Sequence, residues 1–371
     1  INTSSISIPV SYVITMTSVE GCVDSETVIV SVDTNPILTS TNTVNAICSG
    51  ATFDYSLTSN TTGTINWTRA NVSGIFEAAT SGVDTINEVL TNTTNAPITV
   101  TYSVSLPANS SGCTGDPITF DVIVNPEPNV DQPVSQILCV GDFLDVDFDT
   151  TNTGGISGYM WINDNSSIGL PLTGSDDILN IAMTNTSNVS QVATIVVTPT
   201  FDNGGISCTT GPSKTFTITI NPAAQVKPIS SQVVCNGDSF TKITFSTSND
   251  TSGTTTYSWT NDTTSIGLAA AGSADNIGSF PVTNTSTIPQ VATIVVTPTY
   301  RFNGVDCSGS PETFTITVNP SAQVDQPTSL EVCEGVIVSD INFSTLNTVG
   351  ITTYSWTNDN SNIGLAPNGP G

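Results

Sequence analysis

The stretch YSWTND at residues 257–262 returns, with small changes, around each of the four tryptophans of this 371-residue chain. The tryptophans stand at Trp67, Trp161, Trp259 and Trp356, so the steps between them are 94, 98 and 97 residues. The same landmarks accompany the copies in the same order: an Asn-Pro pair, a Cys-x-Gly, the tryptophan, a long Val/Thr-rich segment and a second cysteine. A fixed period of this kind predicts a tandem array of one structural unit.

The last segment before each Asn-Pro pair alternates between apolar residues and threonine. Residues 215–220 read TFTITI and residues 313–318 read TFTITV. Period two puts Phe216, Ile218 and Ile220 on one face and the threonines on the other, which is typical of an antiparallel strand with one solvated face. The proline that follows ends the strand, because it has no N–H to donate to the ladder. We therefore predict short, stiff connectors between the units.

Turn-forming clusters divide the unit that follows Asn221 into about seven short segments of strand-like composition. The predicted strands are 225–234, 240–246, 255–260, 266–268, 277–283, 291–300 and 313–318. Seven short strands with a tryptophan on the third are typical of an immunoglobulin-like sandwich. Thr, Ser and Asn supply most of the polarity and are poor helix formers. The predicted fold class is therefore all-β, an elongated tandem array of seven-stranded Ig-like β-sandwich domains.

The Asn-Pro pairs divide the chain into five parts. The predicted domains are 36–125, 126–221 and 222–319 as complete repeats, 1–35 as the C-terminal part of a repeat, and 320–371 as the N-terminal part of another. The chain opens at Ile1 without the basic and apolar segments of a signal peptide, and it holds no window of about 18 apolar residues. We expect an internal window of a longer exported protein, not membrane-spanning.

The charge balance excludes several classes of function. Five Lys and Arg face 31 Asp and Glu, and the formal charge is -26 with no histidine. Such a chain repels the phosphates of nucleic acids and anionic membrane surfaces. Without histidine it lacks the commonest general base and the commonest zinc ligand. We predict that the protein is not an enzyme, binds no nucleic acid and needs no cofactor.

The tryptophans are interpreted as core residues. Tyr257 and Tyr354 precede Trp259 and Trp356 by two positions, so each pair shares one face of its strand. The alternative is that the indoles stack on carbohydrate, which would need an exposed ring.

Four segments together carry a resemblance to a known family: VCNGD at 234–238, YSWTND at 257–262, QVATIVVTP at 290–298 and DC at 306–307. They resemble the PKD-like, Ig-like tandem repeats of giant surface adhesins of Bacteroidota, and are most similar to the repeats of gliding-motility adhesins of the SprB type. The resemblance covers every unit and implies PKD-like domains. Residues 36–125 diverge most, since they lack the Ile-Gly-Leu that follows the other tryptophans.

The resemblance implies a function and a location. It implies export by the type IX secretion system, display at the cell surface outside the outer membrane, and a structural stalk role in substratum attachment during gliding motility. The implied partners are neighbouring repeats of the same chain, the secretion and gliding machinery, and an external surface or polysaccharide bound by regions outside this sequence. Two other functions fit the same repeats: spacers in a large secreted surface hydrolase, or an array of glycan-binding modules.

Eight cysteines alternate between two positions of the repeat. The early cysteines, in Cys-x-Gly, are Cys48, Cys139, Cys235 and Cys333, and the late cysteines are Cys22, Cys113, Cys208 and Cys307. An even spread of this kind fits disulfides in an oxidising compartment. A metal site is disfavoured because no C-x-x-C and no histidine accompany them.

Two disulfide pairings remain open. Pairing within units would give Cys48–Cys113, Cys139–Cys208 and Cys235–Cys307. In standard sandwich topology, however, the early position and the last hairpin lie at opposite ends, about 30 Å apart, whereas a disulfide needs Cα atoms within about 7 Å. Head-to-tail stacking would place each early cysteine beside the late cysteine of the next unit, giving Cys48–Cys208 and Cys139–Cys307. We favour this pairing between units as a hypothesis.

Three aspartates form a weak candidate for a calcium site. Asp145, Asp147 and Asp149 alternate along one predicted strand and so project from one face. The next unit has Lys242, Thr244 and Ser246 at the matching positions. A solvated acidic face is therefore the preferred interpretation.

Asn-x-Ser/Thr sequons occur at Asn66, Asn92, Asn165, Asn188 and Asn284. Because Asn, Ser and Thr are so common in this chain, chance alone would supply such sequons.

Overall fold

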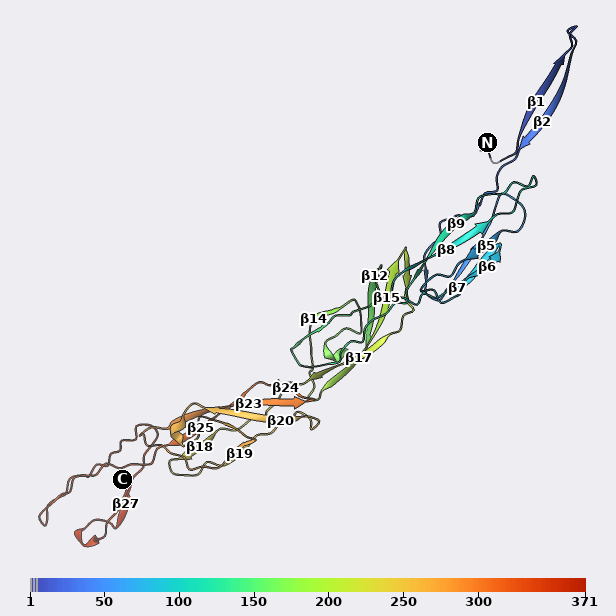
Figure 1. The fold of residues 1–371 in the computed structure, drawn as a ribbon. Helices are drawn as coiled ribbons and strands as arrows, with labels where there is room; N and C mark the ends of the chain where they lie inside the picture. Colours follow the sequence, from blue (N-terminus) through green and yellow to red (C-terminus); the bar gives the residue numbers. More distant parts are fainter. Residues whose placement is uncertain (1, 3, 5) are drawn as a thin grey trace.

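The computed structural model describes residues 2, 4 and 6–371 and shows successive β-sandwiches following one another in an extended chain (Figure 1). We call the three sandwiches unit A (36–125), unit B (126–221) and unit C (222–319). A hairpin of β1 (Ile8–Thr17) and β2 (Val23–Val32) precedes unit A. Within the described residues, helix is limited to three single 3-10 turns, so the all-β prediction is confirmed.

Unit A consists of a five-stranded sheet in the order β3-β9-β8-β5-β6 and a two-stranded sheet of β4 and β7. Its strands are β3 (Ile47–Cys48), β4 (Ala51–Ser56), β5 (Asn66–Arg69), β6 (Thr80–Val83), β7 (Thr85–Leu90), β8 (Ile98–Ser105) and β9 (Ile118–Asn125).

Units B and C share one topology, a six-stranded sheet facing a two-stranded sheet. The larger sheet runs β10-β17-β15-β12-β13 in unit B and β18-β25-β23-β20-β21 in unit C, with β16 and β24 paired to the long strands β15 and β23. The smaller sheets are β11-β14 and β19-β22.

Along the chain, the elements of units B and C have the following bounds. Unit B contains β10 (Gln136–Cys139), β11 (Phe143–Val146), β12 (Ile156–Asn163), η1 (Ser166–Ile168), β13 (Thr173–Ser175), β14 (Ile178–Ala182), β15 (Gln191–Asn203), β16 (Ile206–Cys208) and β17 (Lys214–Asn221). Unit C contains β18 (Gln232–Cys235), β19 (Ile243–Thr244), β20 (Thr254–Asn261), η2 (Thr264–Ile266), β21 (Ala271–Ser273), β22 (Asn276–Ile277), β23 (Gln290–Phe302), β24 (Val305–Ser308) and β25 (Glu312–Asn319). The segment after unit C contains β26 (Ser355–Thr357), η3 (Ser361–Ile363) and β27 (Asn368–Pro370).

The first strand of each unit pairs in parallel with the last strand, while the other strand pairs of the units are antiparallel. In unit B the register pairs Cys139 with Asn221, and in unit A it pairs Cys48 with Asn125. Because parallel strands end at the same edge of a sheet, the early cysteine and the boundary asparagine lie side by side.

Each sandwich buries its own core between its two sheets. In β17, Phe216, Ile218 and Ile220 are 3%, 0% and 0% exposed, while the intervening threonines lie on the other face. The smaller sheet contributes Leu144 and Ile178 from the opposite side. Fully burying side chains of this size contributes about 1.5–3 kcal/mol each, so each unit has a core of its own.

The structure corrects four of the predicted strands of unit C. Of the strand predicted over 277–283, only Ile277 lies in a regular strand, β22. Of the strand predicted over 225–234, only β18 at its end pairs as a strand, since the preceding residues form the connector. Of 240–246, only β19 is regular. Residues 266–268 are not a strand, because the one-turn helix η2 ends there at Gly267, whose φ is +94°.

A hairpin in the last third of units B and C escaped the sequence analysis. In unit C, Phe302 pairs with Val305, so Asn303 and Gly304 form a two-residue turn with φ of 47° and 86°. Asn-Gly is the preferred sequence for such a turn, because both residues need positive φ. The resulting strands β24 and β16 carry the late cysteines.

Candidate functional site: the joints between units

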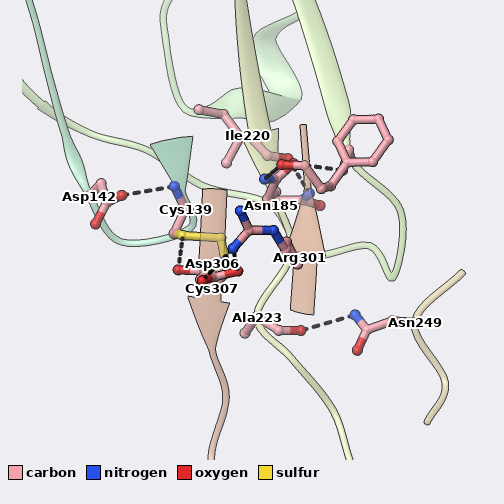
Figure 2. The surroundings of a disulfide bond; sticks show 12 residues. Cys139, Asp142, Asn185, Ile220, Ala223, Asn249, Arg301, Asp306 and Cys307 are labelled. Carbon is pink, nitrogen blue, oxygen red and sulfur yellow. Dashed lines mark hydrogen bonds and ion pairs between the residues drawn. A yellow bond between two sulfur atoms is a disulfide. The ribbon is translucent and has the colours of Figure 1, made fainter. Parts of the chain in front are cut away.

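Two disulfides join consecutive units. Cys48 of unit A is bonded to Cys208 of unit B, with 5.6 Å between their Cα atoms, and Cys139 of unit B to Cys307 of unit C, with 5.5 Å. Figure 2 shows the second bond, with β10 and β24 meeting at it. The structure thus holds the pairing between units, and not the pairing within them.

The remaining cysteine candidates stay unpaired. Within the part of the chain that the structure describes, Cys113 and Cys235 form no disulfide, and neither do Cys22 and Cys333. Cys235 nevertheless occupies the same place as Cys48 and Cys139, since it is the register partner of the boundary residue Asn319.

The boundary asparagines dock the hairpin of the following unit. The Asn125 amide donates to the Asn203 carbonyl at 3.1 Å, and the Asn203 amide donates back to Asn125 Oδ1 at 2.9 Å. At the next joint the Asn221 amide donates to the Phe302 carbonyl at 3.3 Å. Asn125 and Asn221 are fully buried. The Asn-Pro pair was interpreted only as the end of a strand, and its asparagine also positions the neighbouring unit.

A second asparagine in each unit holds the connector. Asn249 accepts from the Gln225 backbone N–H at 2.7 Å and donates to the Ala223 carbonyl at 3.0 Å, so it pairs with the connector as another strand would. The same two bonds recur at the corresponding residues of the other repeats, which are Asn60, Asn152 and Asn347. The prediction of stiff connectors thus has a structural basis that the sequence pattern did not reveal.

Replacing Asn249 by alanine is expected to destabilise the connector of unit C by about 1–3 kcal/mol, because the part-buried N–H of Gln225 and C=O of Ala223 lose their partner. Hydrogen exchange of the intact chain measures this, and the Gln225 amide should exchange at least several-fold faster. Lys242→Ala, which removes an exposed side chain of the same unit, is the control and should leave that rate unchanged. Equal rates in N249A and the wild type would contradict the clamp.

Loops of adjacent units also touch at the joints. The Thr153 N–H donates to the Asn95 carbonyl at 2.8 Å between units A and B, and the Asp250 N–H donates to the Asn188 carbonyl at 3.1 Å between units B and C. The Gln225 side chain adds a bond to Asn188 Oδ1 at 2.8 Å. Each joint therefore combines a backbone connector, a disulfide and several hydrogen bonds, which together restrict bending and twisting.

One joint contains a carboxylate with an altered pKa. Hydrogen bonds from the Ser252 hydroxyl at 2.5 Å and the Tyr300 hydroxyl at 2.6 Å lower the pKa of Asp250 below its ordinary value. Tyr300 is fully buried and is the register partner of Cys307. The Asp250 carboxylate thus connects the joint loop to the strand beside the disulfide.

This arrangement predicts acid sensitivity of the joint between units B and C. A lowered folded-state pKa contributes stability that is fully present above the unfolded value, about 3.9, and is lost as the pH falls through the lower folded value. We expect the Asp250 amide to exchange faster, relative to its intrinsic rate, once the pH drops below about 4. In Asp250→Asn this additional pH dependence should be absent, and a profile identical to the wild type would contradict the assignment.

Three of the tryptophans lie in the cores. Trp67, Trp161 and Trp259 are 5%, 6% and 8% exposed. Trp356, in the segment after unit C, is half-buried, and its assignment as a core residue stays a prediction. In the described residues β26 pairs with β27 alone, whereas the equivalent strand β20 also pairs with the long strand β23.

Each of the four indoles lies directly against a glycine on the neighbouring strand. The register pairs Trp67 with Gly82, Trp161 with Gly174, Trp259 with Gly272 and Trp356 with Gly369. A Cβ on Gly82 would lie 2.6 Å from Cζ2 of Trp67. These glycines follow their tryptophans by 13 or 15 residues, so the pairing leaves a regular spacing in the sequence.

The three aspartates proposed as weak calcium candidates are exposed and lie opposite the buried Leu144 and Val146. The Asp145 carboxylate accepts the Asn180 N–H at 2.6 Å. Across residues 2, 4 and 6–371, no group of three acidic, cysteine or histidine side chains is placed to hold a metal ion. Asp145, Asp147 and Asp149 therefore do not converge on a common centre.

Two of the sequon asparagines are structural. Asn92 and Asn284 are 4% and 2% exposed, and each amide donates to two backbone carbonyls, one of them in the last strand of its unit. Each Oδ1 accepts the N–H two residues later. The Ser or Thr of these sequons therefore belongs to a loop-closing motif. Asn66 and Asn188 are exposed, and Asn165 caps η1.

Comparison with known proteins finds a family match for two of the three complete units. Residues 45–128 and 232–322 match the PKD-like domain family. The chain is a tandem array of all-β sandwiches, and units A and C each contain a segment similar to this PKD-like domain. No curated protein matches it in sequence. Within the described residues, none of the helices is both long and apolar enough to cross a membrane.

Solved structures of other tandem arrays resemble the chain at low identity. The I67–I69 fragment of titin is 10% identical, covers 78% of this chain and all of its own, and gives a TM-score of 0.35. Mouse cadherin-23 EC22–24 is 15% identical over 78% of this chain and all of its own, with a TM-score of 0.27. Drosophila N-cadherin EC1–4 is 12% identical over 85% of this chain and 84% of its own, with a TM-score of 0.31.

Proposed function

We propose that this PKD-like array is a stalk segment of a giant cell-surface adhesin that attaches a gliding cell to its substratum. The observation that carries the proposal is the joint: Cys48–Cys208 and Cys139–Cys307 fasten consecutive units, and buried asparagines dock each hairpin on the preceding unit. A binding module needs no such fastening, whereas an element that transmits tension does.

The surroundings of the proposed stalk follow from its chemistry. Disulfides persist in oxidising compartments, so the cysteine usage fits an extracellular protein. A net charge of -26 keeps neighbouring fibres apart at low ionic strength. Export by the type IX secretion system, contact with the gliding machinery and binding of an external surface by regions beyond this sequence complete the proposal. We also propose that the units begin at Pro36, Pro126, Pro222 and Pro320.

Replacement of the segment in cells that display the protein tests the proposal. Residues 36–319 are exchanged either for an unrelated rigid β-sandwich array of equal unit number or for a glycine-serine linker of equal residue number. We expect the rigid array to preserve surface attachment and movement, and the flexible linker to abolish directed movement at equal surface display. Loss of attachment with both replacements would show that this segment itself binds the substratum, and the stalk proposal would be wrong.

A spectroscopic experiment separates the stalk from a glycan-binding array. The indoles of units A, B and C are buried, so polysaccharide titration should leave the fluorescence of these tryptophans unchanged. A saturable change in W356F, which keeps only the three buried indoles, would favour glycan binding. A spacer in a secreted hydrolase would have the same mechanical role as the stalk but would carry a catalytic domain. The presence of such a domain elsewhere in the full-length gene would distinguish this alternative.

A further inference from the structure

The two disulfides overlap along the sequence. One spans 160 residues, from Cys48 to Cys208, and the other spans 168, from Cys139 to Cys307. The region between Cys139 and Cys208, most of unit B, lies inside both loops. Bonds within units would instead have given separate, successive loops.

The position of each bond determines how tension reaches unit B. Through the backbone alone, tension enters ahead of β10 and leaves after Asn221, at the end of β17. These two strands are parallel over four residue pairs, so opposite pulls would slide them along each other. The bond from Cys139 to Cys307 ties the end of β10 to unit C as well. Both strands are then held at the same edge by the same neighbour.

The shortest covalent route through the array differs from the backbone order. It runs from Cys48 across the first disulfide to Cys208, backward through 69 residues of unit B to Cys139, and across the second disulfide to Cys307. Residues 49–138 and 209–306 are not part of this route. They include most of units A and C and both inter-unit connectors.

We propose that the interlaced disulfides take the connectors out of the load-bearing route and load unit B between Cys208 and Cys139. The connectors then set the geometry of the joints while the disulfides bear sustained tension. This inference deepens the proposed stalk function and rests on it for its biological purpose. The route that the tension takes depends only on which cysteines are bonded to each other.

The proposal predicts how far the fully unfolded chain can extend between Cys48 and Cys307. The backbone from Cys48 to Cys307 comprises 259 residues, whereas the route through both disulfides comprises 69. At about 3.4 Å per residue these correspond to about 880 Å and about 250 Å. While both disulfides are intact, about 190 residues of the unfolded chain cannot extend. This number is far smaller than the sum of the two loop lengths, because both loops contain the segment of unit B between Cys139 and Cys208.

Reduction under constant force tests this on the wild-type protein. The intact chain is held by its two ends, unfolded under oxidising conditions and then exposed to dithiothreitol, which is oxidised as each disulfide becomes two thiols. Breaking either bond first should release only 22 or 30 residues, a step of about 75–100 Å. Breaking the remaining bond should release 168 or 160 residues, a step of about 540–570 Å. Each molecule should show the small step before the large one.

The alternatives give different records. Pairing within units would give three steps of about 220–245 Å, because each loop would hold 65–72 residues. Two disulfides whose loops did not overlap would give two large steps, in either order. Either record would overturn the interlaced route while leaving the stalk proposal to its own test. The variant C113S/C235S removes two cysteines that are unpaired in the structure and should keep the small and the large step.

Discussion

Replacing Arg69 by alanine is expected to cost unit A about 3–5 kcal/mol of unfolding free energy, because the change leaves a carboxylate in the interior without its partner. The Arg69 side chain is fully buried, and its Nε donates to Glu88 at 3.1 Å. Glu88 also accepts from the Tyr102 hydroxyl at 2.5 Å. Burial, followed by the bond to Glu88, raises the pKa of Tyr102 above its ordinary value, so Tyr102 remains a donor.

Arg69 also bonds the loop that crosses its sheet. Its terminal nitrogens donate to the carbonyls of Ala70, Glu77 and Ala78. The residue two positions after the tryptophan is asparagine in the other repeats, and Asn163 and Asn261 donate to loop carbonyls in the same way. The arginine of unit A therefore fills a structural position that asparagine fills elsewhere, with a longer reach and a charge.

Hydrogen exchange of the intact chain measures the cost for unit A alone. The slowest amides of β8 and β9 should exchange about two to three and a half orders of magnitude faster in R69A, at 1.4 kcal/mol for each factor of ten. The matched control is Arg301→Ala, whose partner Asp306 lies 2.8 Å away but whose side chains are 57% and 53% exposed. An exposed pair contributes at most about 1 kcal/mol. A comparable loss in R301A and R69A would disprove the role of burial.

Replacing Gly272 by alanine is expected to cost unit C about 2–3 kcal/mol through overpacking against the tryptophan. A Cβ on Gly272 would lie 2.6 Å from Cε2 and 2.9 Å from Nε1 of Trp259. The indole is confined by the core on its other side, so it cannot move away without displacing neighbours. This close contact leaves room for a hydrogen atom only.

Chemical denaturation followed by exchange in β20 and β23 checks this cost. Gly278→Ala lies in the same unit and is the control, because a Cβ there meets nothing within 4 Å and the glycine needs no positive φ. We expect G278A to match the wild type within about 0.5 kcal/mol. Combining G272A with Trp259→Phe should recover part of the loss, since the smaller ring vacates the space. Purely additive costs would mean that the glycine is needed for another reason.

Much of the fold could be predicted from local patterns. The alternation of Phe216, Ile218 and Ile220 with threonine fixes which face of β17 is buried, because side chains of a strand alternate between faces. The spacing of the tryptophans likewise predicted one sandwich per repeat. The missed strands β16 and β24 also had a local signal, since Gly204-Gly205 and Asn303-Gly304 are typical two-residue hairpin turns.

The clamps at the joints had no such signal. Asn249 is one of many asparagines in a polar loop, and only the folded unit brings it to the connector at Gln225. The buried Asn125 and Asn221 were equally hidden, because their partners lie about 80 residues further along the chain. Burial of the amides, and not the residue type, makes these positions structural.

The sequence by itself determined the repeat, the sandwich class and the two cysteine positions, because these depend on period, alternation and turn chemistry within about 100 residues. It left two disulfide pairings open. Only the tertiary structure decided that Cys139 meets Cys307, because parallel pairing puts Cys139 beside Asn221 at the edge facing unit C, and stacking brings the hairpin of unit C to that edge. Contacts between separately folded units depend on how their ends fit together, which no pattern within one repeat records.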